Sequence, residues 1–342
     1  MSTSEFMLAG LVPGIAAAFD VSLAQAGYLT SAFAAGMVVG APVMAALSRS
    51  WRRRTALVCF LAVFVAMHVV GGLTTSFGVL VGTRLVAAIA NAGFLAVALT
   101  AAAALERPGR ALAVLLGGTT VACVAGIPGG ALLGWRPAFW AVAVLCLPAF
   151  AAVWWIPGAA AGSKPAGLRA ELAELRRLSG VLLVGALVNA ATFGVFTYLA
   201  PVAEGVAPVP VVLGAFGVGC FAGITAAGRL ADRWPGRVVA AGGPLLLAGW
   251  VALALAAHVP AVLVALAFTQ GSLSFAVGGT VIARILRLAE GAPTMKGSYA
   301  TAAFNVGAAA GPVLAGTQAR PFWAAAALVT AALLVHARRR RT

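Results

Sequence analysis

The sequence contains few charged residues and almost no lysine. Asp, Glu, Lys and Arg together make up 9% of its 342 residues, whereas about 25% is usual in soluble domains. Its only lysines are Lys164 and Lys296. A chain with so few charges cannot cover a globule with polar surface. We therefore exclude a soluble fold and expect lipid to be the main solvent of the folded chain.

The sequence also lacks the residue groups that metal or nucleotide chemistry requires. Its four cysteines lie inside apolar stretches without metal-ligand spacing, so we interpret them as packing residues. No glycine-rich phosphate loop joins a lysine, which argues against ATP as an energy source. His68, His258 and His336 are scattered along the chain, and no acid pair or Ser/His/Asp set converges. We expect neither an enzyme nor a metal site, and no cofactor.

Long apolar stretches make up most of the chain, in which residues of the set AVILMFWYC account for 62%. A helix that spans a bilayer needs about 20 such residues, whereas spanning strands would be shorter and would alternate with polar residues. These stretches do not alternate, so we predict an all-α membrane protein. We expect one partial span within residues 1–18 and full spans at 25–47, 55–75, 77–104, 111–133, 138–157, 180–201, 209–231, 238–257, 260–283, 298–317 and 321–337.

The basic residues give this predicted bundle an orientation. The net charge of +15 is spread over the loops between spans rather than gathered in one patch, so we do not expect nucleic acid as a partner. Of the 23 Lys and Arg residues, 20 fall in loops on one side and two, Arg136 and Arg320, on the other. The basic side of a membrane protein faces the cytoplasm. We therefore expect a multi-pass protein of a bacterial cytoplasmic (inner) membrane, with its C-terminus inside the cell.

The two halves of the chain repeat one another at a nearly constant offset. Gly126 and Gly311 lie 185 positions apart, and each precedes an Arg-Pro pair and a tryptophan. Because each half holds six spans, the repeat keeps its orientation in the membrane, as in transporters with parallel repeats. We expect an N-terminal half at 1–157, whose first span is partial, and a C-terminal half at 180–342. The cavity that binds substrate is expected between the halves.

The segment between the halves, residues 158–179, is predicted to be a cytoplasmic linker. Its second part carries Leu168, Leu172, Leu175 and Leu178 at helical spacing. We expect a short amphipathic helix there that lies on the membrane surface.

Several motifs resemble those of the major facilitator superfamily. The turn from Gly228 to Arg237 reads GRLADRWPGR and is similar to the family signature G-x-L-A-D-R-x-G-R. The first-half copy departs from the signature, because Ser48 stands where the family usually has Asp. Two small-residue motifs with proline, one in each half, resemble the antiporter motif of drug exporters. The resemblance implies a major facilitator fold whose conformational switch involves Ser48, Arg49, Gly126, Pro128, Asp232, Arg233, Arg237, Gly311 and Pro312.

Further stretches resemble the twelve-span drug:proton antiporters and, among these, actinobacterial chloramphenicol exporters. They include Thr3-Ser-Glu-Phe, Asn91-Ala-Gly-Phe and Asn189-Ala-Ala-Thr-Phe. The resemblance implies a monomer that exports small amphiphilic drugs, with chloramphenicol among the expected substrates, in exchange for protons. Substrate contacts are expected from carboxamides and aromatic rings, which suit an apolar, lightly polar ligand: Asn91, Phe94, Asn189, Phe193, Tyr198, Gln270 and Asn305. The alternative for each Asn in a span is an interhelical hydrogen bond without contact to substrate.

Proton coupling needs an ionisable group within the membrane. Of the eight acids, seven fall in or beside predicted loops, and only Glu5 lies within a predicted span. Arg84 lies inside another span, where a charge is costly and indicates function. We therefore expect Glu5 and Arg84 to couple transport to a proton gradient. The related proteins have about ten more apolar residues before this Glu, so we expect the start of the first span to be missing.

Two other functions remain open from the sequence alone. A transporter of the same fold could export a sugar or another metabolite, although its cavity would require more acids and carboxamides than this chain offers. The missing part of the first span also raises the possibility of a remnant that does not transport.

Overall fold

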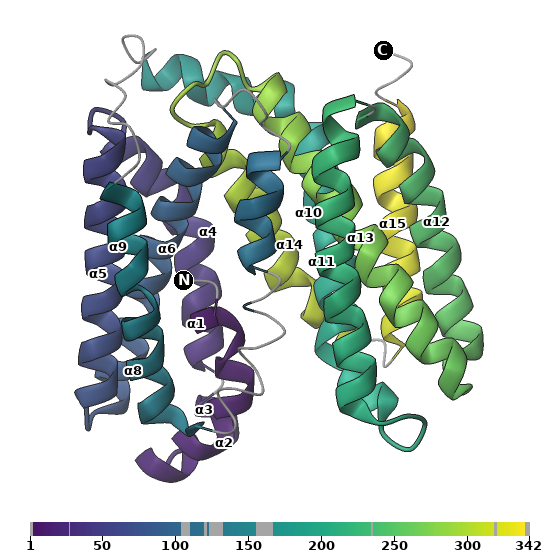
Figure 1. Cartoon of the computed structure of the whole chain (residues 1–342), viewed down its shortest axis with the longest axis horizontal. Helices are drawn as coiled ribbons and strands as arrows, with labels where there is room; N and C mark the ends of the chain where they lie inside the picture. The colour runs from purple at the N-terminus through teal and green to yellow at the C-terminus, as the bar shows by residue number, and fades with distance from the viewer. Residues whose placement is uncertain are drawn as a thin grey trace. The chain divides into compact units, whose positions relative to one another are not determined.

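A computed structural model of the chain describes residues 3–26, 28–103, 110–119, 122, 133–154, 167–233, 235–317 and 320–338. Within these ranges the regular elements are all helices, as the sequence predicts (Figure 1). Within these ranges nine helical segments are long and apolar enough to cross a membrane, if Trp135–Trp154 is counted as one segment. Large apolar side chains on their surfaces face outward, including Leu73, Trp154 and Leu255, each more than 60% exposed. Such exposure is expected where the solvent is lipid.

The helices end close to the predicted boundaries. In chain order they are α1 (Thr3–Phe6), α2 (Leu8–Phe19), α3 (Leu23–Ala26), α4 (Tyr28–Ser48), α5 (Arg53–Leu73), α6 (Phe77–Ala102), α8 (Trp135–Leu145), α9 (Leu147–Trp154), α10 (Leu168–Ala203), α11 (Val209–Arg233), α12 (Pro235–Ala256), α13 (Pro260–Leu288), α14 (Lys296–Thr317) and α15 (Pro321–Arg338). A further apolar helix covers Arg110–Thr119. The predicted span 138–157 begins earlier, at Trp135, and is divided into α8 and α9 at Cys146.

The predicted short amphipathic helix is not a separate element, which corrects that expectation. Its residues form the start of α10, which continues as one helix from Leu168 to Ala203. Leu172 and Leu175 are exposed, as a face toward the membrane surface requires, whereas Leu178 is buried. No proline or glycine interrupts the chain at 168–179, so the linker helix joins the following span without a break.

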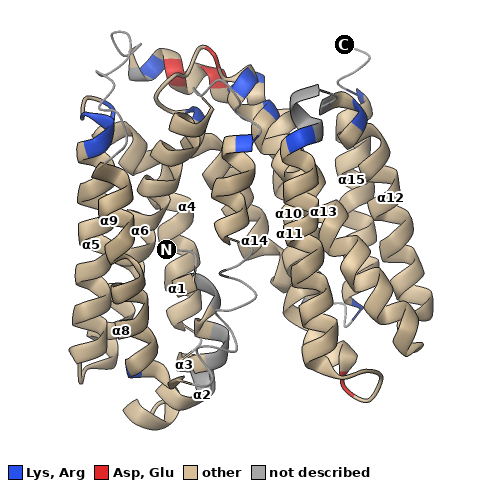
Figure 2. Ribbon diagram, viewed as in Figure 1, with Lys and Arg blue, Asp and Glu red and all other residues tan. Residues whose placement is uncertain are grey.

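The chain forms two compact units. The first contains residues 1–100, 125–172 and 291–302, and the second contains 101–124, 173–290 and 303–342. In the first unit, a buried core gathers side chains of α2, α4, α5, α6 and α8 around Phe33, Phe64 and Phe139. In each unit Lys and Arg gather toward one end of the helices (Figure 2).

Small residues let helices approach closely within the second unit. α11 and α13 meet where Gly219 lies against Phe268 and Gly223 against Ser272, with no room for a side-chain carbon on either glycine. α10 and α14 meet in the same way at Gly194 and Gly311. Close backbone contact of this kind is how helices pack in lipid, where burial of apolar surface drives association little.

Candidate functional site

A buried polar cluster lies in the first unit, where α1, α5, α6 and α8 contribute Ser4, His68, Arg84 and Phe139. All four side chains have 0% of their surface exposed. The guanidinium carbon of Arg84 lies 4.3 Å from the centre of the Phe139 ring. Arg84 Nη1 donates a hydrogen bond to Ser4 Oγ at 2.7 Å and lies 3.4 Å from His68 Nε2. The structure therefore holds Arg84 within the protein rather than at the membrane surface.

The hydrogen bonds of His68 determine which atoms donate and which accept in the rest of the cluster. Its Nδ1 lies 2.7 Å from the carbonyl oxygen of Phe64, which can only accept, so this nitrogen carries a proton. A neutral ring then offers only Nε2 as an acceptor, and this atom lies 2.6 Å from Ser4 Oγ. The Ser4 hydroxyl thus donates to His68 and accepts from Arg84. Each of the three side chains constrains the next in this cluster.

Two nitrogens of Arg84, Nε and Nη2, have no hydrogen-bond partner among the described residues. A guanidinium presents five donors and no acceptor, and a buried charge without a partner is costly. An acceptor is therefore expected beside this edge of Arg84. The side chain of Glu5, predicted to act with Arg84, lies outside the described residues, although its backbone belongs to α1 and directly follows Ser4.

The role of His68 in a polar site was not predicted from the sequence. The three histidines were noted only as scattered along the chain, and the contact of His68 with Ser4 was not foreseen. Ser4 and His68 are 64 positions apart, and Ser4 and Arg84 are 80 apart. The only signal in the sequence was a histidine inside an otherwise apolar span, which is an unusual and costly place for a polar ring.

The polar residues predicted to contact substrate form hydrogen bonds to other helices. In the second unit, Asn189 Nδ2 donates to the Phe304 carbonyl at 2.7 Å and Tyr198 donates to the Pro312 carbonyl at 3.1 Å. Both bonds join α10 to α14. Gln270 is fully buried in α13 and its amide nitrogen donates to the Leu246 carbonyl of α12 at 2.8 Å.

The remaining predicted substrate residues are partly or fully buried. Asn91 of α6 is buried and its amide lies 3.3 Å from the sulfur of Met37. Phe94, Phe193 and Asn305 are each half-buried. The interhelical bonds of Asn189, Tyr198 and Gln270 match the alternative interpretation, in which polar residues join helices, and they leave contact with a substrate untested.

The predicted switch residues are only partly described. Ser48 is buried and its hydroxyl donates to the Met44 carbonyl of its own helix at 2.7 Å, while Arg49 is half-buried and Arg237 exposed. Gly311 is buried and Pro312 half-buried, both in α14. Gly126 and Pro128 lie outside the described residues, as do the side chains of Asp232 and Arg233. Among the described residues, no group of three His, Cys, Asp or Glu side chains could hold a metal ion.

Comparison with known proteins agrees with the motifs and the fold. The sequence profile of the Major Facilitator Superfamily matches residues 1–207. A chloramphenicol resistance protein of Streptomyces lividans is 58% identical over 98% of this chain and 92% of its own length. The inner membrane transport protein YdhP of Escherichia coli (strain K12) is 30% identical over 92% of this chain and 85% of its own length.

Solved structures share the fold at low sequence identity. The transporter FucP in its outward conformation superposes with a TM-score of 0.78 at 16% identity, over 100% of this chain and 97% of that chain. The human organic anion transporter MFSD10 gives a TM-score of 0.75 at 17% identity, over 95% of this chain and 88% of that chain. Members of the superfamily whose profile matches this chain are multi-pass membrane transporters, which are not enzymes and generally need no cofactor. The chain belongs to the major facilitator superfamily.

Proposed function

We propose that this chain is a proton-coupled exporter of small amphiphilic drugs, with chloramphenicol as the substrate to test first. The substrate proposal is supported by the 58% identity to the chloramphenicol resistance protein over nearly the whole chain. The proton gradient is its energy source. It acts as a monomer in a bacterial cytoplasmic membrane, with the 20 basic residues of one side and the C-terminus in the cytoplasm.

The observation that supports proton coupling best is the buried edge of Arg84. Its Nε and Nη2 have no acceptor among the described residues, and Ser4 holds its third nitrogen. Glu5 directly follows Ser4 in α1, so its carboxylate is the acid closest in sequence to this edge. A carboxylate partner would neutralise Arg84 in one state of the cycle, and a proton would take the place of Arg84 in another.

Substrate contacts are assigned to polar and aromatic residues of both halves, 1–157 and 180–342. An amphiphilic ligand needs mostly apolar walls with a few placed polar groups, and these side chains supply both: Asn91, Phe94, Asn189, Phe193, Tyr198, Gln270 and Asn305. The conformational switch is assigned to the loop and motif residues of the two halves: Ser48, Arg49, Gly126, Pro128, Asp232, Arg233, Arg237, Gly311 and Pro312.

The test is Glu5→Gln, which keeps the size of the side chain and removes its titration. In inside-out vesicles from cells lacking other exporters, this variant should abolish chloramphenicol transport driven by an imposed pH gradient while drug binding remains. The matched control is Glu204→Gln, because Glu204 is exposed beyond the end of α10. If Glu5→Gln transports as well as the parent at every imposed gradient, Glu5 is not the coupling group. If the parent confers no resistance, chloramphenicol is not its substrate.

A further inference from the structure

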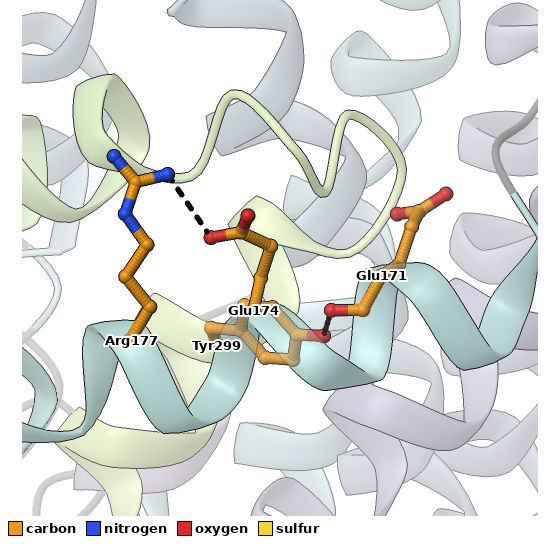
Figure 3. A network of polar contacts seen from close by, with 4 residues as sticks. All are labelled: Glu171, Glu174, Arg177 and Tyr299. Atoms are coloured by element: carbon orange, nitrogen blue, oxygen red, sulfur yellow. Dashed lines mark hydrogen bonds and ion pairs between the residues drawn. The ribbon is translucent and has the colours of Figure 1, made fainter.

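Glu171 is a fully buried carboxylate in the segment between the two halves, where the sequence predicted a surface helix. Its Oε2 accepts hydrogen bonds from the backbone N–H groups of Thr294 at 3.0 Å and Met295 at 2.9 Å. The Thr294 hydroxyl lies 2.7 Å from Oε1. The Tyr299 hydroxyl donates to the Glu171 carbonyl oxygen at 2.7 Å (Figure 3). We call this set of bonds the Glu171 cap.

The Glu171 cap stabilises the start of α14. Thr294 and Met295 are the two residues immediately before Lys296, where α14 begins. Backbone N–H groups at the start of a helix have no partner within the helix, and a negative charge there also complements the helix dipole. Here the acceptor comes from a residue 123 to 124 positions earlier in the chain. A carboxylate with no exposed surface would be costly without such donors. The cap is therefore a specific contact between the linker and α14, rather than an incidental surface bond.

The capped end of α14 lies directly against the end of α6. A methyl group on Gly297, one residue into α14, would overlap the carbonyl oxygen of Ala96 and crowd the hydroxyl of Thr100. Both residues are in the last two turns of α6. α6 belongs to the first half of the repeat and α14 to the second, and both ends lie beside the basic loops that we assign to the cytoplasm. If the two halves of the repeat part on the cytoplasmic side, as alternating access requires, the contact between α6 and α14 breaks.

We propose that Glu171 is a positioning residue of the transport cycle, which keeps the start of α14 against the end of α6 and so favours the state closed to the cytoplasm. In the first-half turn, the Ser48 hydroxyl bonds within its own helix and carries no charge. The negative charge at the start of α14 comes from Glu171 of the linker. This inference rests on the proposed transport function and on the cytoplasmic assignment of the basic side.

The test replaces Glu171 by Gln and measures how open the α6–α14 contact is. A cysteine at Thr100, in the full chain without its native cysteines, is labelled by a thiol reagent in inside-out vesicles. Glu171→Gln should raise the labelling rate by about 3- to 30-fold, the range that loss of a helix cap produces. The control is Glu174→Gln, since Glu174 pairs with exposed Arg177 one turn away at 3.5 Å (Figure 3) and such pairs contribute little.

Transport gives a second measurement that a loss of folding would not imitate. Glu171→Gln should lower the maximal rate of efflux several-fold and also lower the half-saturating drug concentration, because the state open to cytoplasmic drug becomes more populated. A loss of folded protein would lower only the maximal rate. Should Glu171→Gln reduce the amount of protein in the membrane, Thr294→Val removes one donor of the cap and leaves the charge. It should shift labelling in the same direction by a smaller factor.

Equal labelling of the parent and of both cap variants would overturn the proposal. Labelling requires no substrate, so this result is distinct from a failure of the proposed drug transport. Loss of efflux in Glu5→Gln with unchanged labelling would leave the Glu171 cap as proposed, since the two sites act on different steps.

Discussion

Replacing Ser4 by Ala is expected to destabilise the buried polar cluster and to impair transport. The change removes the acceptor of Arg84 Nη1 at 2.7 Å and the donor to His68 Nε2 at 2.6 Å. It deletes a single oxygen atom and keeps the helix propensity of α1 favourable, because alanine is the best helix former. Any large effect therefore comes from the two lost hydrogen bonds.

The magnitude follows from the kinds of bond that are lost. A hydrogen bond to a charged group contributes about 1.5–3 kcal/mol in soluble proteins, whereas side-chain bonds between membrane helices average about 0.6 kcal/mol. The Arg84 bond belongs to the stronger kind. Part of the loss is recovered, because Arg84 Nη1 already lies 3.4 Å from His68 Nε2 and can approach it. We expect a net loss of about 2 kcal/mol, or roughly 30-fold in the unfolding equilibrium.

The assay is an unfolding titration of the purified protein in mixed micelles of mild detergent and SDS, followed by drug efflux in cells. The control is Ser272→Ala, because the Ser272 hydroxyl is exposed and donates to the Phe268 carbonyl of its own helix rather than to another helix. That variant should change the unfolding free energy by less than about 0.5 kcal/mol. If Ser4→Ala also stays within that limit and exports drug as the parent does, the cluster does not hold Arg84 in place and the reasoning fails.

Three further predictions concern orientation, the second-half turn and the α10–α14 contact. Single cysteines at Arg176 and Arg237, in a background without native cysteines, should resist an impermeant thiol reagent in intact cells; labelling from outside would reverse the orientation. Asp232→Asn should lower efflux while the amount of protein in the membrane stays constant. Unchanged efflux would show that the motif around Asp232 forms a turn without a role in transport. Tyr198→Phe removes the bond to the Pro312 carbonyl and should cost about 0.6 kcal/mol of stability, with a larger loss of drug binding only if Tyr198 contacts substrate.

The helical membrane fold could be predicted from the sequence because it depends on local properties. A stretch of apolar residues long enough to cross the bilayer must form a helix, whatever it packs against. The boundaries of α11, α13 and α15 accordingly lie near the predicted ones. The linker was less well predicted, since leucine spacing shows that residues 168–178 are helical but does not show that the helix continues into the next span.

The polar contacts could not be predicted in the same way, because they depend on which helices are neighbours and how each is rotated. Arg84 was recognised from the sequence since a charge in a span is costly wherever it lies. Its partners Ser4 and His68, at separations of 80 and 16 residues, were not. Glu171 was placed in a surface helix from the spacing of the leucines around it, yet it is fully buried and accepts a hydrogen bond from Thr294, 123 residues away.

The sequence by itself determined that lipid is the main solvent of the folded chain, where the helices lie, how they are expected to be oriented, and to which family the chain belongs. Each of these is a sum over many residues, or a motif within one short stretch, so it is unaffected by small changes in packing. Only the tertiary structure decided that Ser4 and His68 hold Arg84 and that Glu171 caps α14. A hydrogen bond depends on atomic positions to within a few tenths of an ångström, and such positions are set by the packing of whole helices rather than by their sequence patterns.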